Sequence, residues 1–282
     1  MINEIFKKIS KFSRSRITPI LSKNFSFDRQ ITFCKTIQSK VIFSEKKSRV
    51  KWTGSCFVIL DKRIPEFSYE FRHQQQGNLA YEQGILERAE ILSKSYFLNL
   101  IDFKDGDIFY DCGANVGDIH LWFLLNNIAI DYTAFEPSPI EYQCLKNNIS
   151  SNKLKNLGLW NSEGVLRFYL SSQGADSSLI QPKNYDETID IKVDKLENLI
   201  NGKIKCLKIE AEGAEPEILE GIGNKLNMIE FITADLGYER GVLEESTFIP
   251  VTNYLLQRNF ELIEVGKDRI CALYKNNNFK TD

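Results

Sequence analysis

The sequence predicts an α/β protein, in which a doubly wound, mostly parallel sheet of seven strands follows an N-terminal extension with β-strand and helical patterns. Two observations support this prediction. Short apolar segments alternate with helical patterns over about 170 residues, as in a sheet whose parallel strands are joined by helices. The charge is also divided, since residues 1–63 carry 15 Lys and Arg against four acidic side chains, whereas the other 219 residues carry 21 against 34.

Length and composition narrow the class of protein. A chain of 282 residues with 43% hydrophobic and 26% charged residues can bury a core, which excludes wholesale disorder. No apolar run reaches the roughly 18 residues that a membrane-spanning helix requires, and no secretory signal is expected at the N-terminus. The six cysteines form no CxxC pair, so we expect neither a zinc site nor disulfides, and we expect a reducing, cytoplasmic location.

Residues 1–77 are predicted to form a basic extension. Within it, residues 1–16 place apolar side chains at three- to four-residue spacing among lysines and arginines, which predicts a short amphipathic helix. Such a helix can bind weakly to an anionic membrane surface, pack on the domain or remain solvated, and the sequence leaves these alternatives open. Strands of hairpins are expected at ITF, KVIF, RVKW and CFVIL, and a loop is expected at residues 65–77.

Residues 78–282 are predicted to form the α/β domain itself. Its helices are expected at residues 78–100, 119–126, 140–149, 215–219 and 247–258. Its strands are expected at residues 108–111, 132–136, 156–160, 205–210 and 231–235, followed by an antiparallel pair at residues 260–265 and 269–275. Ligands of such sheets bind outside the carboxyl ends of the strands, so the loops that follow the strands hold the candidate site.

The loop after the first strand of this domain is the main candidate for binding. It reads DCGANVG, and Gly113 and Gly117 allow a sharp turn and a close approach of the backbone to a ligand. The next helix directs free N–H groups at the same place. Glu136 ends the second strand, 25 positions after Asp111, where a carboxylate can accept two hydrogen bonds from a ribose diol. Loop and acid together predict a site for a nucleoside-containing cofactor.

Asp111 favours S-adenosylmethionine (SAM) over a dinucleotide. A carboxylate at this position would repel a diphosphate, whereas it would attract the ammonium and sulfonium groups of SAM. Asn115 would complete the contacts to the amino-acid end of that cofactor. The alternative is that Asp111 only caps the helix that begins near Gly117.

Two further strand ends carry the candidate catalytic residues. The segment KIEAEG ends a strand at Glu210 and continues to Glu212, and Asp235 ends the following strand. Buried carboxylates cost several kcal/mol unless they are paired, which indicates a function in binding or in deprotonating an acceptor hydroxyl. Glu212 and Asp235 are the preferred bases, ahead of Glu210 and His120. The alternative for the glutamates is an ion pair with Lys208 together with capping of the next helix, and no metal is expected.

These motifs resemble those of the FkbM-type methyltransferases, a branch of the class I SAM-dependent enzymes with a Rossmann-like fold. The resemblance spans residues 105–275 and rests on the segments DCGANVGD, AFEPSP, LGLWNSEG, ADSSLI, VDKLENLI, LKIEAEGAEPEILEGI and ADLGYERG. It implies that the cofactor is held by Asp111, Gly113, Asn115, Gly117 and Glu136, and that the adenine lies against Trp160 and Asn161. The chain departs from the family's pattern at Glu210, where many relatives have aspartate.

The resemblance also implies the reaction, which is transfer of a methyl group from SAM to a hydroxyl of a sugar, a glycan or another secondary metabolite. The expected partner is therefore a small-molecule or glycan acceptor. The acidic domain has no basic stripe along its sheet, which argues against a nucleic-acid substrate. Methylation of an amine, a non-catalytic SAM-binding scaffold and an NAD-dependent oxidoreductase remain as alternatives. The sequence leaves the acceptor and the oligomeric state open.

Overall fold

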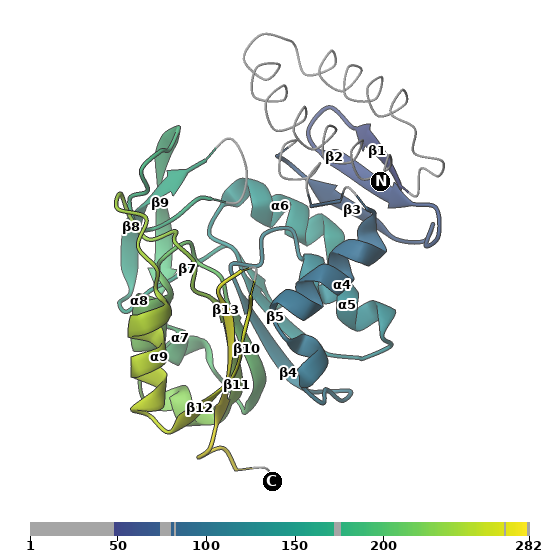
Figure 1. Cartoon of the computed structure of the whole chain (residues 1–282). Coiled ribbons are helices and arrows are strands. Elements are labelled where there is room, and N and C mark those ends of the chain that lie inside the picture. The colour runs from purple at the N-terminus through teal and green to yellow at the C-terminus, as the bar shows by residue number, and fades with distance from the viewer. Residues whose placement is uncertain (1–47, 74–79, 82, 172–175, 268, 281–282) are drawn as a thin grey trace, which may run out of the picture.

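The structure is a computed structural model, and it describes residues 48–73, 80, 81, 83–171, 176–267 and 269–280. At its centre lies a seven-stranded sheet (Figure 1) in the order β12 (Phe260–Val265), β13 (Cys271–Asn276), β11 (Ile229–Asp235), β10 (Ile204–Ile209), β4 (Ile108–Cys112), β5 (Asp131–Phe135) and β6 (Leu154–Lys155). Neighbouring strands pair in parallel, except that β13 runs antiparallel to β11 and β12. The predicted α/β class with a mostly parallel, seven-stranded sheet is confirmed.

The helices cover both faces of this sheet (Figure 1). They are α4 (Ile85–Ser95), α5 (Asp118–Leu125), α6 (Pro139–Asn148), α7 (Leu196–Leu199), α8 (Glu215–Glu220) and α9 (Phe248–Leu256), with short 3-10 turns η1 (Leu98–Leu100) and η2 (Gly223–Met228). The helix predicted over residues 78–100 is interrupted at Gly84, whose φ of 116° a helix cannot contain, so α4 begins at Ile85. Residues 78, 79 and 82 of the predicted range lie outside the described residues.

The third strand of the sheet differs from the prediction. Residues 156–160 were expected to form it, but the strand that pairs with β5 is β6, and the next two residues in strand conformation form β7 (Gly158–Leu159) in another sheet. That sheet has the order β7-β9-β8, with β8 at Gly164–Leu170 and β9 at Glu187–Asp194. Neither β8 nor β9 is among the strands predicted from the sequence. Both strands alternate exposed with partly buried or buried residues, so the period-2 pattern was present.

The N-terminal part that the structure describes forms a three-stranded antiparallel sheet of β1 (Ser48–Trp52), β2 (Phe57–Asp61) and β3 (Ser68–Phe71). The hairpin predicted from RVKW and CFVIL is confirmed, whereas the loop predicted over residues 65–77 is wrong at β3. Phe57 and Phe71 belong to the same hydrophobic cluster as Phe109 of the large sheet. The proposed division at residue 77 thus separates segments that share one core. The helix predicted at residues 1–16 and the strands ITF and KVIF lie outside the described residues.

Two hydrophobic clusters lie on opposite faces of the large sheet. Adjacent residues of β4 alternate between them, since Phe109 joins the cluster that contains α4 and α5, and Tyr110 joins the cluster that contains α8 and α9. Because β10, β4 and β5 run parallel, their carboxyl ends meet at one edge of the sheet, between the two layers of helices. Within the described ranges, no helix combines the length and the apolar character that crossing a membrane would require.

Candidate active site

The loop between β4 and α5 lies tightly against the end of β10. Gly113, Asn115 and Gly117 all adopt left-handed backbone conformations, with φ of 74°, 50° and 89°. A Cβ atom on Gly113 would lie 1.8 Å from the carbonyl oxygen of Glu210, and one on Gly117 would lie 2.5 Å from the side chain of Ile149. Larger residues therefore do not fit at either glycine, and the turn is built for close approach.

A cavity lies over the carboxyl ends of β4, β5 and β10. Of the ten residues that the sequence proposed for the site, six line it, namely Asp111, Gly113, Asn115, Glu136, Glu210 and Glu212. The remaining four, Gly117, Trp160, Asn161 and Asp235, are not among its lining residues. Trp160 packs against the small sheet of β7, β8 and β9, and the amide of Asn161 donates a hydrogen bond to Glu220 at 2.9 Å.

Glu136 ends β5 and is held by the backbone of the loops on either side. One of its oxygens accepts a hydrogen bond from the N–H of Asn115 at 2.7 Å, and the other accepts one from the N–H of Ser138 at 2.8 Å. Burial, together with the nearby charge of Glu141, raises the pKa of Glu136 to about 8. Each oxygen keeps a second lone pair, so the carboxylate can accept two further hydrogen bonds from a diol.

Glu141 joins this end of the cavity to the N-terminal part of the chain. Its Oε1 lies 2.5 Å from Nε2 of His73, and its other oxygen accepts a hydrogen bond from the hydroxyl of Ser138. Burial opposes ionisation of Glu141, but His73 outweighs this effect and keeps its pKa below the usual value. His73 has no role predicted from the sequence, because no local pattern connects residues that lie 68 positions apart.

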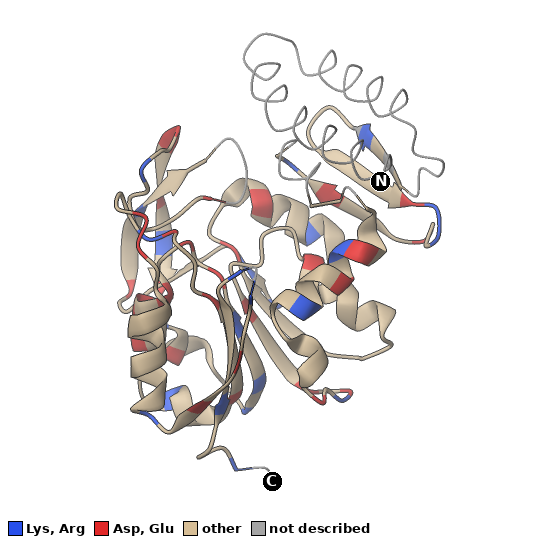
Figure 2. Cartoon of the chain, viewed as in Figure 1, with Lys and Arg blue, Asp and Glu red and all other residues tan. Residues whose placement is uncertain are grey.

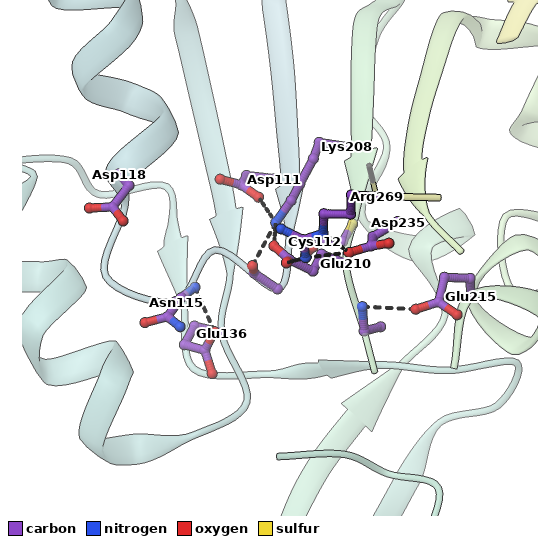
Figure 3. Close-up of polar contacts among 12 residues, drawn as sticks. Asp111, Cys112, Asn115, Asp118, Glu136, Lys208, Glu210, Glu215, Asp235 and Arg269 are labelled. Atoms are coloured by element: carbon purple, nitrogen blue, oxygen red, sulfur yellow. Dashed lines mark hydrogen bonds and ion pairs between the residues drawn. The ribbon is translucent and has the colours of Figure 1, made fainter. Parts of the chain in front are cut away.

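Lys208 is the buried cation at the centre of the site (Figure 3). Its Nζ lies 2.9 Å from Oδ1 of Asp111, 3.1 Å from Oε2 of Glu210 and 2.7 Å from the carbonyl oxygen of Gly113. The other oxygen of Asp111 accepts a hydrogen bond from Tyr132 at 2.5 Å. The pair with Glu210 was the alternative left open by the sequence, and the structure shows that it forms.

A second cation, Arg269, extends this network towards β11. It comes from the turn between β12 and β13 and forms ion pairs with both Glu210 and Asp235. Two cations thus face three carboxylates, and the network carries one excess negative charge. Burial opposes ionisation of Glu210, but Lys208 and Arg269 outweigh it and hold the pKa of that carboxyl well below its usual range. Glu210 and Asp235 are therefore both engaged by cations.

Glu212 differs from these two acids because its side chain forms no ion pair with any described residue. It lines the cavity and has a left-handed φ of 49°. Burial, with the nearby charge of Glu239, raises its pKa well above the usual value. Figure 2 shows acidic residues in red along the loops that run from the large sheet towards β8 and β9. Of the three proposed catalytic acids, Glu212 is thus the one that lines the cavity without a cation engaging it among the described residues.

The remaining candidate, His120, lies away from the cavity lining. Its ring packs against Tyr132 at a centroid distance of 4.9 Å, and burial lowers its pKa to about 4. Within the described ranges, no group of three or more His, Cys, Asp or Glu side chains is arranged to hold a metal ion.

Comparisons with known proteins match part of the chain to a methyltransferase domain. Residues 111–262 match the family model described as the Methyltransferase FkbM domain. The chain is 23% identical over 181 residues to the 31-O-demethyl-FK506 methyltransferase FkbM of Streptomyces tacrolimicus, covering 51% of this chain and 70% of that protein. It is 28% identical over 178 residues to the methyltransferase sdnD of Sordaria araneosa, covering 48% and 69%.

Among solved structures, the chain is similar to the crystal structure of methyltransferase FkbM from Methylobacillus flagellatus KT. The two chains are 18% identical, and their TM-score is 0.44. The similarity covers 63% of this chain and 45% of the other, so this chain spans less than half of that protein's length.

Proposed function

The chain belongs to the FkbM methyltransferase domain family, since the family model matches more than half of its residues, and we propose that it is an O-methyltransferase acting on a hydroxyl of a sugar, a glycan or another secondary metabolite. Membership of this family makes SAM the methyl donor. The oxygen acceptor is supported by the relative from Streptomyces tacrolimicus, whose name specifies a 31-O-demethyl compound. The free thiols of all five cysteines within the described ranges support a cytoplasmic location.

The arrangement of Glu136 beside the glycine loop carries the proposal. Its two oxygens each hold one backbone N–H and keep a lone pair for a ribose hydroxyl. The network around Lys208 has an excess of negative charge, which favours a sulfonium cation and disfavours a diphosphate. The residues present therefore fit SAM better than a dinucleotide, and Asp111, Gly113, Asn115 and Gly117 shape the same pocket. Trp160 and Asn161 are proposed to border the adenine, which then has to extend past the residues that line the cavity.

When bound, SAM supplies an activated methyl group, so the chain mainly has to align the acceptor and receive its proton. We assign the proton to a carboxylate oxygen of Glu212, because cations already engage Glu210 and Asp235. Lys208 holds the carbonyl of Gly113 and thereby fixes the glycine loop relative to β10. A positioned base of this kind typically contributes about 10²–10⁴-fold to the rate.

Incubation of the purified protein with methyl-labelled SAM and a panel of sugar, glycan, lipid-linked and amine acceptors tests the proposal. We expect label in hydroxyl acceptors and tight binding of S-adenosylhomocysteine (SAH). Label found only in amines would overturn O-methylation but keep the enzyme class. Binding of NADH without binding of SAH would contradict the cofactor, and binding of SAH without transfer to any acceptor would favour a non-catalytic scaffold.

A further inference from the structure

We propose that Arg88 of α4 binds the carboxylate of the amino-acid end of SAM. The inference rests on the proposed function, because it names the residue that holds one end of that cofactor. Arg88 precedes residue 111, so it lies outside the segment that matches the family model. It was also absent from the residues singled out in the sequence, where it is one of several charged positions on a predicted helix.

Arg88 is fixed at the wall of the cavity by Asp118. Its Nε donates a hydrogen bond to Oδ2 of Asp118 at 2.9 Å, and the hydroxyl of Tyr81 donates to the other oxygen of the same carboxylate. Asp118 is the first residue of α5 and directly follows the glycine loop. Both Arg88 and Asp118 line the cavity, and their side chains are only 23% and 12% exposed. The guanidinium is therefore held beside the loop rather than extended into solvent.

The other donors of this guanidinium have no partner among the residues that the structure describes. Arginine has five N–H groups, and in Arg88 only Nε donates a hydrogen bond to a described residue. Arg63, which lies in the same N-terminal part, is different, because its Nε and both Nη atoms bond to Asp61 and Glu87. A largely buried guanidinium with spare donors in a cavity wall is suited to a planar anion, which it can bind through two parallel hydrogen bonds.

The charges that line the cavity identify that anion. Six acids line it, namely Asp111, Asp118, Glu136, Glu141, Glu210 and Glu212, and the lining includes only two cations within the described ranges, Arg88 and Lys208. The ammonium of Lys208 is already surrounded by Asp111, Glu210 and the carbonyl of Gly113. The carboxylate is the single anionic group of SAM, and among so many acids it needs a cation with free donors.

The position of Arg88 also suits the length of the cofactor. Figure 3 shows Asp118 at the start of α5, apart from Glu136 at the end of β5, with Asp111 between β5 and β10. If Glu136 holds the ribose, the amino-acid end has to extend away from it along the glycine loop. The Arg88–Asp118 pair stands beside that loop, so it can receive the far end of the molecule.

Isothermal titration calorimetry with two ligands tests the inference. The ligands are SAH and its decarboxylated analogue S-adenosyl-3-thiopropylamine, which lacks only the carboxylate. We expect Arg88→Met to weaken SAH binding by about 10- to 100-fold, the range for a hydrogen-bonded charge pair, and to change binding of the analogue by less than about twofold. Arg88→Lys should recover part of the affinity for SAH. Lys94→Met, on the exposed side of the same helix, is the matched control.

A double variant separates attraction by Arg88 from repulsion by an unpaired Asp118. If Arg88 binds the carboxylate, Arg88→Met/Asp118→Asn should still bind SAH weakly, whereas recovery of affinity in the double variant would overturn the inference. Equal weakening of both ligands would also overturn it, since it would show that Arg88 only supports the pocket. If the unaltered protein bound neither ligand, the proposed function itself would fail, which is a distinct result.

Discussion

Replacing Glu136 by glutamine perturbs the proposed ribose site with almost no change of shape. In the structure each carboxylate oxygen accepts one backbone N–H, at 2.7 Å from Asn115 and 2.8 Å from Ser138. The glutamine NH2 group would have to face one of these N–H donors, and the remaining carbonyl oxygen is a neutral acceptor. Glu136→Gln should therefore lose one ribose hydrogen bond and weaken the other.

The expected loss follows from the type of hydrogen bond. Bonds to a charged group contribute about 1.5–3 kcal/mol, and neutral bonds about 0.5–1.5 kcal/mol. Losing one charged bond and weakening another costs about 2–4 kcal/mol in this geometry, which corresponds to about 30- to 1,000-fold in the Kd of SAH. Calorimetry above pH 8, where the carboxyl of Glu136 is ionised, measures this change directly. Glu261→Gln, at an exposed position of β12, serves as the control and should leave the Kd unchanged.

The same site predicts a pH dependence. Burial and the charge of Glu141 raise the pKa of unliganded Glu136 to about 8. Ribose hydroxyls donate to the charged form, so binding lowers this pKa and releases a proton. The affinity of the unaltered protein for SAH should rise with pH up to about pH 8 and level off above it, whereas the affinity of Glu136→Gln should lack this rise. Equal affinity of both proteins, or an affinity that falls between pH 6 and 8, would refute the assignment.

Three further changes test other parts of the site. Gly113→Ala places a Cβ 1.8 Å from the carbonyl oxygen of Glu210 and should lower the free energy of unfolding by at least about 2 kcal/mol in urea titrations; Gly106→Ala, with a similar φ of 85° and open space, should cost less. Glu212→Gln should lower kcat by about 10²–10⁴-fold with SAH affinity retained, and an unchanged kcat would exclude it as the base. Lys208→Met leaves the buried Asp111 and the partly buried Glu210 without this counter-ion and should destabilise the fold by about 3–5 kcal/mol in the same titrations, so an unfolding curve equal to that of the unaltered protein would contradict the network.

The large sheet could be predicted from the sequence because its central strands are apolar and short, with helical patterns between them. IFYD and FITAD are almost entirely buried in the structure, and buried parallel strands give this continuous signal. The strands β8 and β9 were predictable as well, because their residues carry a period-2 pattern, although the strand prediction did not include them. The strand β3 was missed because four residues after a proline-containing turn carry little pattern of their own.

The strand-end acids of the site were also predictable, since their position depends only on where each strand ends. Their partners were not, because ion pairs between distant segments have no sequence period. Arg269 reaches Asp235 and Glu210 from the hairpin of β12 and β13, near the C-terminal end of the described chain. Arg88 comes from α4, the helix that precedes β4 in the chain. Without those partners, the sequence favoured Asp235 as a base as much as Glu212, with Glu210 behind both.

A crystal structure of the protein with SAH tests the central claim most directly, because it shows where each part of the cofactor lies. The account predicts both ribose hydroxyls within hydrogen-bond distance of Glu136, the glycine loop along the amino-acid end, and the carboxylate on the guanidinium of Arg88. Density for the adenosyl group outside this cavity, or a ribose that makes no contact with Glu136, would contradict it.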